Sequence, residues 1–406
     1  MPLTSDRRGQ RPSYPERQTL TSDPTPTEPT QELRSVFTAS LPAIFAQLQI
    51  SLVVSTYQAG KVILVRQDAG AATNGHGPTS TINTHFRTFH KPMGMAVQGN
   101  KLAIGGQKTV WELHNMPAVA RKLEPRPNGR EPSGRGKHDA CYLPRRIHIT
   151  GDIDIHEMAY AADGELWLVN TRFGCLCTLD AVHSFTPHWR PPFVTAYAPE
   201  DRCHLNGLAM VDGRPQYVTA LGETDSAGGW RANKANGGLL MDIETNEVLL
   251  RGLSMPHSPR WYNGQLYVLE SGQGSLAVVD LEKARQLPPA LRTIAQLPGF
   301  TRGLDFYGPL AFIGLSQVRE SATFSGLPLI DRLGEERTCG VWVVHIESGQ
   351  TLGFLRFESG VQEIFAVQVL PNTRFPELLE WEDERLAHSY VLPDAALAET
   401  PLAERV

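Results

Sequence analysis

The sequence predicts an all-β protein, a six-bladed β-propeller, from two observations. A glycine turn is followed by an alternating apolar strand five times, and the glycines are spaced 44 to 65 residues apart. These turns begin at Gly99, Gly164, Gly213, Gly264 and Gly308. A four-stranded unit that recurs in this way cannot bury its faces alone and stacks with its neighbours around an axis. The 36 glycines and 30 prolines among 406 residues are typical of such a turn-rich fold.

The chain before the first strand divides into two parts. Residues 1–30 are polar and rich in proline, and we expect a disordered tail rather than a secretory signal. Residues 31–49 carry apolar residues at roughly helical spacing, and Pro42 divides this helical lead-in into two short helices. We expect one propeller domain over residues 31–380 and a C-terminal tail over 381–406.

One blade is predicted to combine the two ends of the chain. Six innermost strands are expected but only five second strands, because the chain after Leu370 turns into a polar segment. Residues 51–56 supply the missing second strand, 61–65 the third and 82–89 the fourth. This closure removes free sheet edges. The polar segment 115–142 is predicted to be a long loop rather than a seventh blade.

A column of mostly polar residues is predicted at the axis. It appears when the six innermost strands are aligned, and it contains Met93, His156, Asn206, His257, Arg302 and Glu363. Equivalent residues of repeated blades point the same way, so the column predicts a ring around the channel. His156, His257 and Glu363 lie on alternate blades and are a ligand set for a divalent ion, iron or zinc.

The remaining candidate residues would act on a substrate. Asn206 and Arg302 could hold a carbonyl or carboxylate, and His204 or Tyr57 could transfer a proton. The long turns 222–236 and 315–339 and a shorter turn lie on the same face, where binding residues concentrate. They bring Arg172, Trp230, Arg319 and Glu320 to the mouth as substrate-binding residues.

Composition excludes several classes of protein. The net charge of −5 gives no reason to expect a nucleic-acid partner. No stretch approaches the roughly 18 apolar residues of a membrane span, so we expect a cytoplasmic protein. The five cysteines include no CxxC pair and are expected to be reduced thiols.

Four motifs resemble a bacterial family of conserved hypothetical propeller proteins, over about residues 31–380. The motifs are His204–Ala209, Gly229–Arg231, Met255–Trp261 and Arg302–Leu304. This resemblance carries no established activity. More distantly, the residues Asn206–Ala209 are similar to the start of a strand in six-bladed propellers of the regucalcin and gluconolactonase type, which bind a divalent ion. The alternate-blade ligands look more like those of peptidyl-amidoglycolate lyase, a propeller with axial histidines on zinc, from which Glu363 departs.

Two functions follow as hypotheses. The first is a metal-dependent enzyme that acts at the axial mouth on a small anionic or peptide-like substrate, as a lyase, hydrolase or oxygenase. The second is a non-catalytic module that binds a small molecule or peptide without a metal, through Arg302, Arg319, Glu320 and Trp230.

Overall fold

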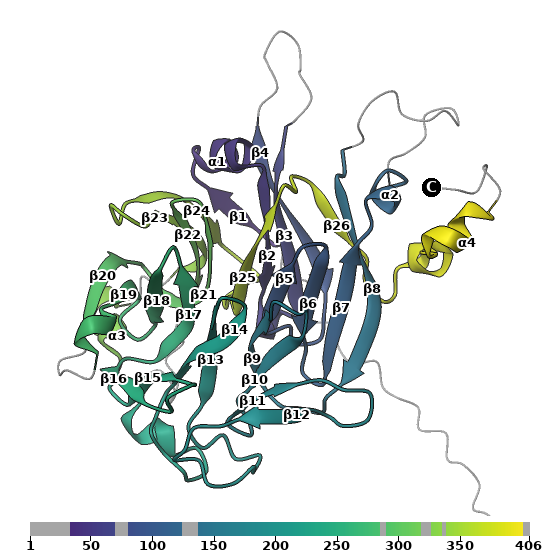
Figure 1. The fold of residues 1–406 in the computed structure, drawn as a ribbon. Coiled ribbons are helices and arrows are strands. Elements are labelled where there is room, and N and C mark those ends of the chain that lie inside the picture. Colours follow the sequence, from purple (N-terminus) through teal and green to yellow (C-terminus); the bar gives the residue numbers. More distant parts are fainter. Residues whose placement is uncertain are drawn as a thin grey trace, which may run out of the picture. The chain divides into compact units, whose positions relative to one another are not determined.

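The computed structural model describes residues 33–69, 80–123, 137–284, 290–317, 326–334 and 338–400. Residues from Leu33 onward form one compact unit. Six β-sheets are arranged in it as a six-bladed β-propeller (Figure 1). The innermost strands contact one another in a closed order, β5, β9, β13, β17, β21, β25 and back to β5. The predicted fold class is therefore confirmed.

Three blades have the simple order of four consecutive antiparallel strands. The first consists of β9 (Ile155–Tyr160), β10 (Leu166–Asn170), β11 (Cys175–Thr178) and β12 (Thr186–Trp189). The second consists of β13 (Leu205–Val211), β14 (Arg214–Ala220), β15 (Gly238–Asp242) and β16 (Val248–Leu253). The third consists of β17 (Pro256–Tyr262), β18 (Gln265–Glu270), β19 (Ser275–Val279) and β20 (Leu291–Gln296).

Two blades carry a fifth strand at the outer edge. One consists of β5 (Met95–Gln98), β6 (Lys101–Gly105), β7 (Thr109–Asn115), β8 (Ala140–Ile149) and β26 (Pro376–Leu378). The other consists of β21 (Phe300–Tyr307), β22 (Leu310–Ser316), β23 (Cys339–His345), β24 (Thr351–Phe357) and β1 (Ser35–Phe37). The added strands β26 and β1 pair with β8 and β24, so both cover an edge that would otherwise be open.

The sixth blade joins the two ends of the chain, as predicted. It consists of β25 (Ala366–Pro371), β2 (Ile50–Ser55), β3 (Lys61–Asp68) and β4 (Thr81–Thr88). The innermost strand β25 pairs with β2 over six residue pairs, from Ile50 with Pro371 to Ser55 with Ala366. Every residue of β2 is buried, since β2 lies between β25 and β3 and its two faces pack against the two neighbouring blades.

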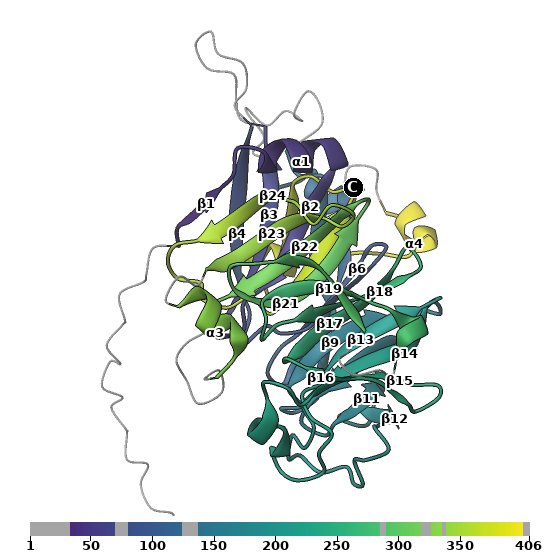
Figure 2. The same ribbon diagram turned by 90° about the vertical axis from the view of Figure 1, so that its left-hand side faces the viewer.

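The lead-in is only partly helical. The predicted second helix is α1 (Leu41–Leu48), which has Pro42 in its first turn and packs against β3 and β24 (Figure 2). The predicted first helix is instead the short strand β1, because the edge of β24 offers these residues backbone hydrogen bonds.

Short helices interrupt the segments between strands. Within the predicted loop 115–142, the helix α2 (Pro117–Ala120) follows β7, β8 begins at Ala140, and residues 124–136 lie outside the described part. The helix α3 (Pro328–Leu333) lies between β22 and β23, and α4 (Asp394–Ala398) lies in the C-terminal segment. No helix in the described part is long and apolar enough to span a membrane.

Candidate functional site

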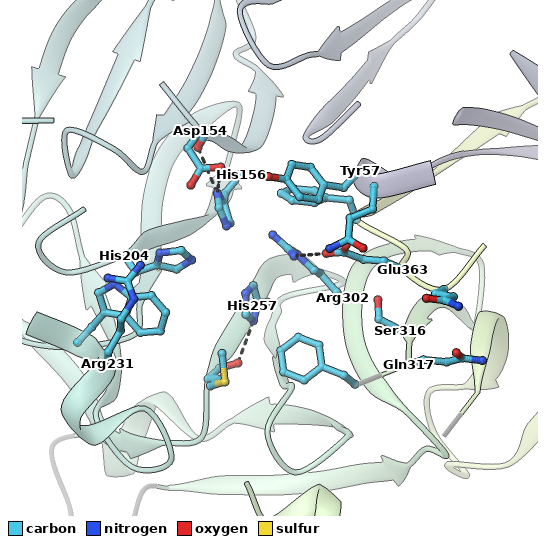
Figure 3. Close-up of a pocket in the computed structure, with 16 residues that line it drawn as sticks. Tyr57, Asp154, His156, His204, Arg231, His257, Arg302, Ser316, Gln317 and Glu363 are labelled. Atoms are coloured by element: carbon cyan, nitrogen blue, oxygen red, sulfur yellow. Dashed lines mark hydrogen bonds and ion pairs between the residues drawn. The ribbon is translucent and has the colours of Figure 1, made fainter. Parts of the chain in front are cut away.

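A pocket of about 490 Å³ opens where the innermost strands begin (Figure 3). It is lined by Tyr57, Gln58, Asp154, His156, His204, Trp230, Arg231, Met255, His257, Phe300, Arg302, Ser316, Gln317, Gln362, Glu363 and Phe365. We call it the axial pocket. Most of its lining comes from residues at or just before the starts of β9, β13, β17, β21 and β25, so the propeller's rotational repeat assembles it.

An unusual backbone conformation recurs at this position. Asp154, His204 and Met255 directly precede β9, β13 and β17 and have φ values of 55°, 51° and 45°. L-residues are strained in this left-handed region, and such residues cluster at functional sites. The conformation positions the carbonyls of Asp154 and Met255 to accept hydrogen bonds from the histidines two residues later.

Those hydrogen bonds orient two of the three pocket histidines. His156 Nδ1 lies 3.1 Å from the carbonyl oxygen of Asp154, and His257 Nδ1 lies 2.9 Å from that of Met255. Burial lowers the pKa of both imidazoles well below the usual value, so both are neutral at pH 7. With Nδ1–H donating to a carbonyl, Nε2 carries the free lone pair.

The third histidine is held by a carboxylate. His204 Nδ1 donates to Asp201 Oδ1 at 2.9 Å. The other oxygen of Asp201 accepts from Trp230 Nε1 at 2.9 Å and from Arg231 Nη2 at 3.3 Å. The His204 ring lies 4.5 Å from the Trp230 ring and 4.6 Å from the His156 ring, between centroids. These contacts fix the orientation of the His204 ring, and Nε2 is the ring nitrogen left to contact a ligand.

Arg302 is the main cation of the axial pocket. Its Nη1 donates to Glu363 Oε1 at 3.2 Å, and its Cζ lies 3.5 Å from the centroid of the Phe365 ring. Only 13% of the side chain is exposed, and burial lowers its pKa. A guanidinium has five N–H donors, and among the described residues this bond to Glu363 is the only side-chain hydrogen bond of Arg302.

Asp154 and Tyr57 are two further polar side chains of the lining. The Asp154 carboxylate lies 3.6 Å from His156 Nδ1, beyond hydrogen-bond length, and burial raises its pKa. Burial, and then the charges of Asp154 and Glu363, raise the pKa of the Tyr57 hydroxyl. Tyr57 is therefore a proton donor at neutral pH.

A buried ion pair lies just past the pocket residues along the strands. Arg260 donates two hydrogen bonds to Glu157, at 3.0 and 2.9 Å, and a third of 3.3 Å to the carbonyl of Leu208. Glu157 directly follows His156 on β9, whereas Arg260 is on β17 and Leu208 on β13. The pair therefore crosses the interior and joins three innermost strands.

The predicted ring is assembled in part. His156, His257, Arg302 and Glu363 line the axial pocket together, as do Tyr57, His204 and Trp230. Arg319 and Glu320 lie outside the described residues.

Three other predicted positions do not line the pocket. Asn206 is 2% exposed and bonds to the Pro256 carbonyl and the Thr219 hydroxyl, at 3.0 and 2.7 Å, so it joins neighbouring blades. Met93 is buried in an apolar cluster. Arg172 pairs with Asp152 at 3.1 Å.

A second column of residues at the strand starts was not predicted, apart from His204. Asp154, His204 and Met255 stand two positions before His156, Asn206 and His257. Aligning the strand starts two residues earlier would have placed Asp154 and Met255 at the mouth with His204. Asp201 had no such signal, because its role depends on the turn before β13.

The predicted metal ligands share the axial pocket, but Glu363 is paired with Arg302. Within the described ranges, no group of three or more His, Cys, Asp or Glu side chains is arranged to hold a metal ion. A divalent ion at His156, His257 and Glu363 stays a prediction.

Comparison with known proteins gives a family and a set of structural likenesses. The family described as a domain of unknown function (DUF4915) matches residues 39–379. No curated protein matches the chain in sequence. Resemblances to gluconolactonase-type and peptidyl-amidoglycolate-lyase-type propellers stay predictions.

Solved structures similar to this chain include three of different origin. A chain of a nidogen/laminin complex has a TM-score of 0.47 and 8% identity, with 80% of this chain and 99% of that chain covered. A catalytically inactive virginiamycin B lyase from Staphylococcus aureus with quinupristin has a TM-score of 0.36, 9% identity and coverages of 80% and 99%. A putative oxidoreductase (glucose dehydrogenase) from Thermus thermophilus has a TM-score of 0.38, 13% identity and coverages of 76% and 93%.

Proposed function

The chain belongs to the DUF4915 family, and we propose that its axial pocket is an acid–base site for a small carboxylate-bearing molecule. The chemistry proposed is proton transfer, as in a lyase. One observation carries the proposal: a buried guanidinium with open donors and a carboxylate-held imidazole line the same pocket.

Arg302 would bind the carboxylate. Its guanidinium lies over the Phe365 ring and engages Glu363 through one nitrogen. An arginine prefers to meet a carboxylate through two parallel hydrogen bonds, which fix both position and orientation. A desolvated cation with unused donors gains most from such a ligand, since no water has to be displaced from most of its surface.

His204 would be the base and Tyr57 the acid. Asp201 fixes the His204 tautomer with the proton on Nδ1 and stabilises the imidazolium formed when Nε2 accepts a proton. Trp230 and Arg231 hold Asp201 in place, so the base is preorganised. Tyr57 keeps its proton at neutral pH and can donate it to a developing negative charge.

Substitution of Arg302 tests the binding step. Arg302→Gln should lower the affinity for small carboxylates, measured by calorimetry, at least tenfold. Arg172→Gln is the matched control, because Arg172 pairs with Asp152 and does not line the pocket. Equal affinities in Arg302→Gln and the parent protein would contradict the proposal.

Substitution of Asp201 tests the catalytic step. Once a turned-over carboxylate is found by screening, Asp201→Asn should lower kcat by about 10²–10⁴-fold and shift the pH–rate profile, because the tautomer and the imidazolium lose their support. If every carboxylate that binds through Arg302 is left unchanged chemically, the pocket is a binding site, which was the alternative hypothesis.

A metal-dependent form of this chemistry is favoured by a separate observation. All three pocket histidines have Nδ1 bonded to a carbonyl or carboxylate, which is how proteins orient metal-binding imidazoles. His156 and His257 would be the ligands, with Glu363 if it leaves Arg302, and the ion would polarise a substrate oxygen.

Elemental analysis tests this form directly. Protein supplied with Fe(II), Zn(II) or Mn(II) should retain about one ion per chain, and a His156→Ala, His257→Ala double variant should retain none. Parent protein that stays free of metal would refute it.

A further inference from the structure

We propose that the ligand of the axial pocket is a zwitterion, a molecule of amino-acid type with one carboxylate and one ammonium group. The inference rests on the proposed function and extends it, because among the described residues the pocket presents a carboxylate that accepts no hydrogen bond as well as a guanidinium with unused donors. The two groups are Asp154 and Arg302.

The charge balance of the pocket leaves one carboxylate over. Its lining contains two carboxylates, Asp154 and Glu363, and two guanidiniums, Arg231 and Arg302. Arg231 is paired with Asp201, which lies behind His204, and Arg302 is paired with Glu363. Asp154 is therefore the lining carboxylate that forms no ion pair with an arginine in the described part of the chain.

Asp154 is placed to receive a donor from a ligand. Its side chain is 30% exposed and, within the described part of the chain, its carboxylate accepts no hydrogen bond. The nearest imidazole nitrogen, His156 Nδ1, is 3.6 Å from Oδ1 and donates to the backbone carbonyl instead. A partly desolvated carboxylate without donors is costly, and a ligand ammonium would relieve this cost.

Arg302, in the same pocket, has hydrogen-bond donors that lack an acceptor within the described ranges. Four of its five donors have no hydrogen-bond acceptor among the described residues. Figure 3 shows Asp154 and Arg302 on the two sides of the His156 ring, with Tyr57 beside them. A monoanion would satisfy Arg302 and repel Asp154, whereas a zwitterion satisfies both.

The other walls suit the hydrocarbon part of such a ligand. Four apolar side chains line the axial pocket: Trp230, Met255, Phe300 and Phe365. The first three also belong to one apolar cluster. Apolar walls with a few converging polar groups are typical of small-molecule sites. An amino acid with an apolar side chain fits this division better than one with a second charge.

Calorimetric titration of the full chain with three matched ligand sets tests the inference. The first set is leucine, phenylalanine and ω-amino acids from glycine to 5-aminopentanoate. The second is the N-acetyl derivatives, which lack the ammonium group, and the third is the amides, which lack the carboxylate. We expect at least one zwitterion to bind tenfold or more tightly than both of its derivatives.

A variant pair assigns the ammonium to Asp154. Asp154→Asn should abolish the preference for the zwitterion over its N-acetyl derivative while N-acetyl binding persists. Asp152→Asn is the matched control, since Asp152 pairs with Arg172 and does not line the pocket. Should Asp154→Asn fail to fold, the ligand series on the parent protein still decides the question.

The outcomes separate this inference from the proposed function. N-acetyl derivatives that bind as tightly as the zwitterions would overturn the zwitterion and leave the carboxylate site standing. Amides that bind as tightly as the zwitterions would overturn both, because Arg302 would then have no role.

Discussion

Single residues determine where the pocket's functional groups point. The left-handed residues before β9, β13 and β17 each cost roughly 1–3 kcal/mol, which the surrounding blades must offset. The strained conformation is tolerated because it directs the carbonyls of Asp154 and Met255 at histidines and places His204 against Asp201. Outside the pocket, the attachment of one strand likewise depends on a single residue, Glu377.

Glu377 fastens the C-terminal strand β26 to the sixth blade. Its Oε1 accepts from Arg87 at 2.7 Å and lies 3.0 Å from His85 Nε2. Burial acts to raise the pKa of this carboxyl, but the close contact with His85 and the hydrogen bonds from Arg87 outweigh burial and lower the pKa below 4.5. A carboxyl whose pKa is lowered on folding stabilises the protein above its unfolded pKa, and this contribution is lost as the pH falls.

Glu377→Gln should therefore lower the thermal midpoint most at pH 7. The difference from the parent protein should narrow as the pH falls below about 4.5, because the unfolded carboxyl then binds a proton that the folded carboxyl resists, and this favours unfolding of the parent. Differential scanning calorimetry at several pH values measures this. Glu244→Gln, at an exposed position, is the control, and a difference independent of pH would contradict the assignment.

At the scale of elements, the innermost strands are joined by polar side chains as well as by packing. Arg260 and Glu157 connect β17 with β9, which are not neighbours, and Arg260 also reaches β13. Breaking a buried pair leaves an uncompensated charge and costs about 3–5 kcal/mol, whereas replacing both partners by apolar residues often costs little.

Arg260→Met should thus lower the free energy of unfolding by about 3–5 kcal/mol. The double variant Glu157→Leu, Arg260→Met should recover most of that loss, and urea denaturation followed by circular dichroism measures both. Arg214→Met, at an exposed position on β14, is the control. A single variant as stable as the parent would show that the pair contributes nothing to joining the strands.

The strands were predictable where periodicity is strong, and the rest depended on tertiary contacts. Second strands such as Gly264 to Leu269 alternate after a glycine turn, and the structure has β18 there. The three-residue strands β1 and β26 have no such signal, because they exist only through pairing with β24 and β8.

The candidate site was predictable to the same extent. Rotational symmetry placed His156, His257 and Arg302 together, but it also placed Asn206 there. Asn206 turns into the blade interface because the Pro256 carbonyl and Thr219 hydroxyl satisfy its amide. Spacing along the chain cannot reveal such a local competition between partners.

At the scale of the whole molecule, one hydrogen-bonded seam closes the ring. The strand β25 lies between β21 and β5 and pairs with β2, more than 300 residues away in sequence. Without β25, the buried residues of β2 and the edge of that blade would be exposed, which favours association between chains.

A chain that ends at residue 360 should accordingly aggregate or elute as large species in size-exclusion chromatography. It retains five complete innermost strands but lacks β25 and β26. A chain that ends at residue 392 keeps every strand and lacks only α4 with its flanking residues, so it should elute like the full chain. A truncated chain at 360 that elutes normally and unfolds cooperatively would contradict the role of the seam.

The Glu157–Arg260 pair has a consequence for the rigidity of the axial pocket. Glu157 directly follows His156 on β9, and the hydrogen bonds of Arg260 connect this position with β13 and β17. These three strands cannot move apart without breaking buried hydrogen bonds, which is costly. A ligand would therefore enter a largely preformed site, and its binding should rearrange the blades little.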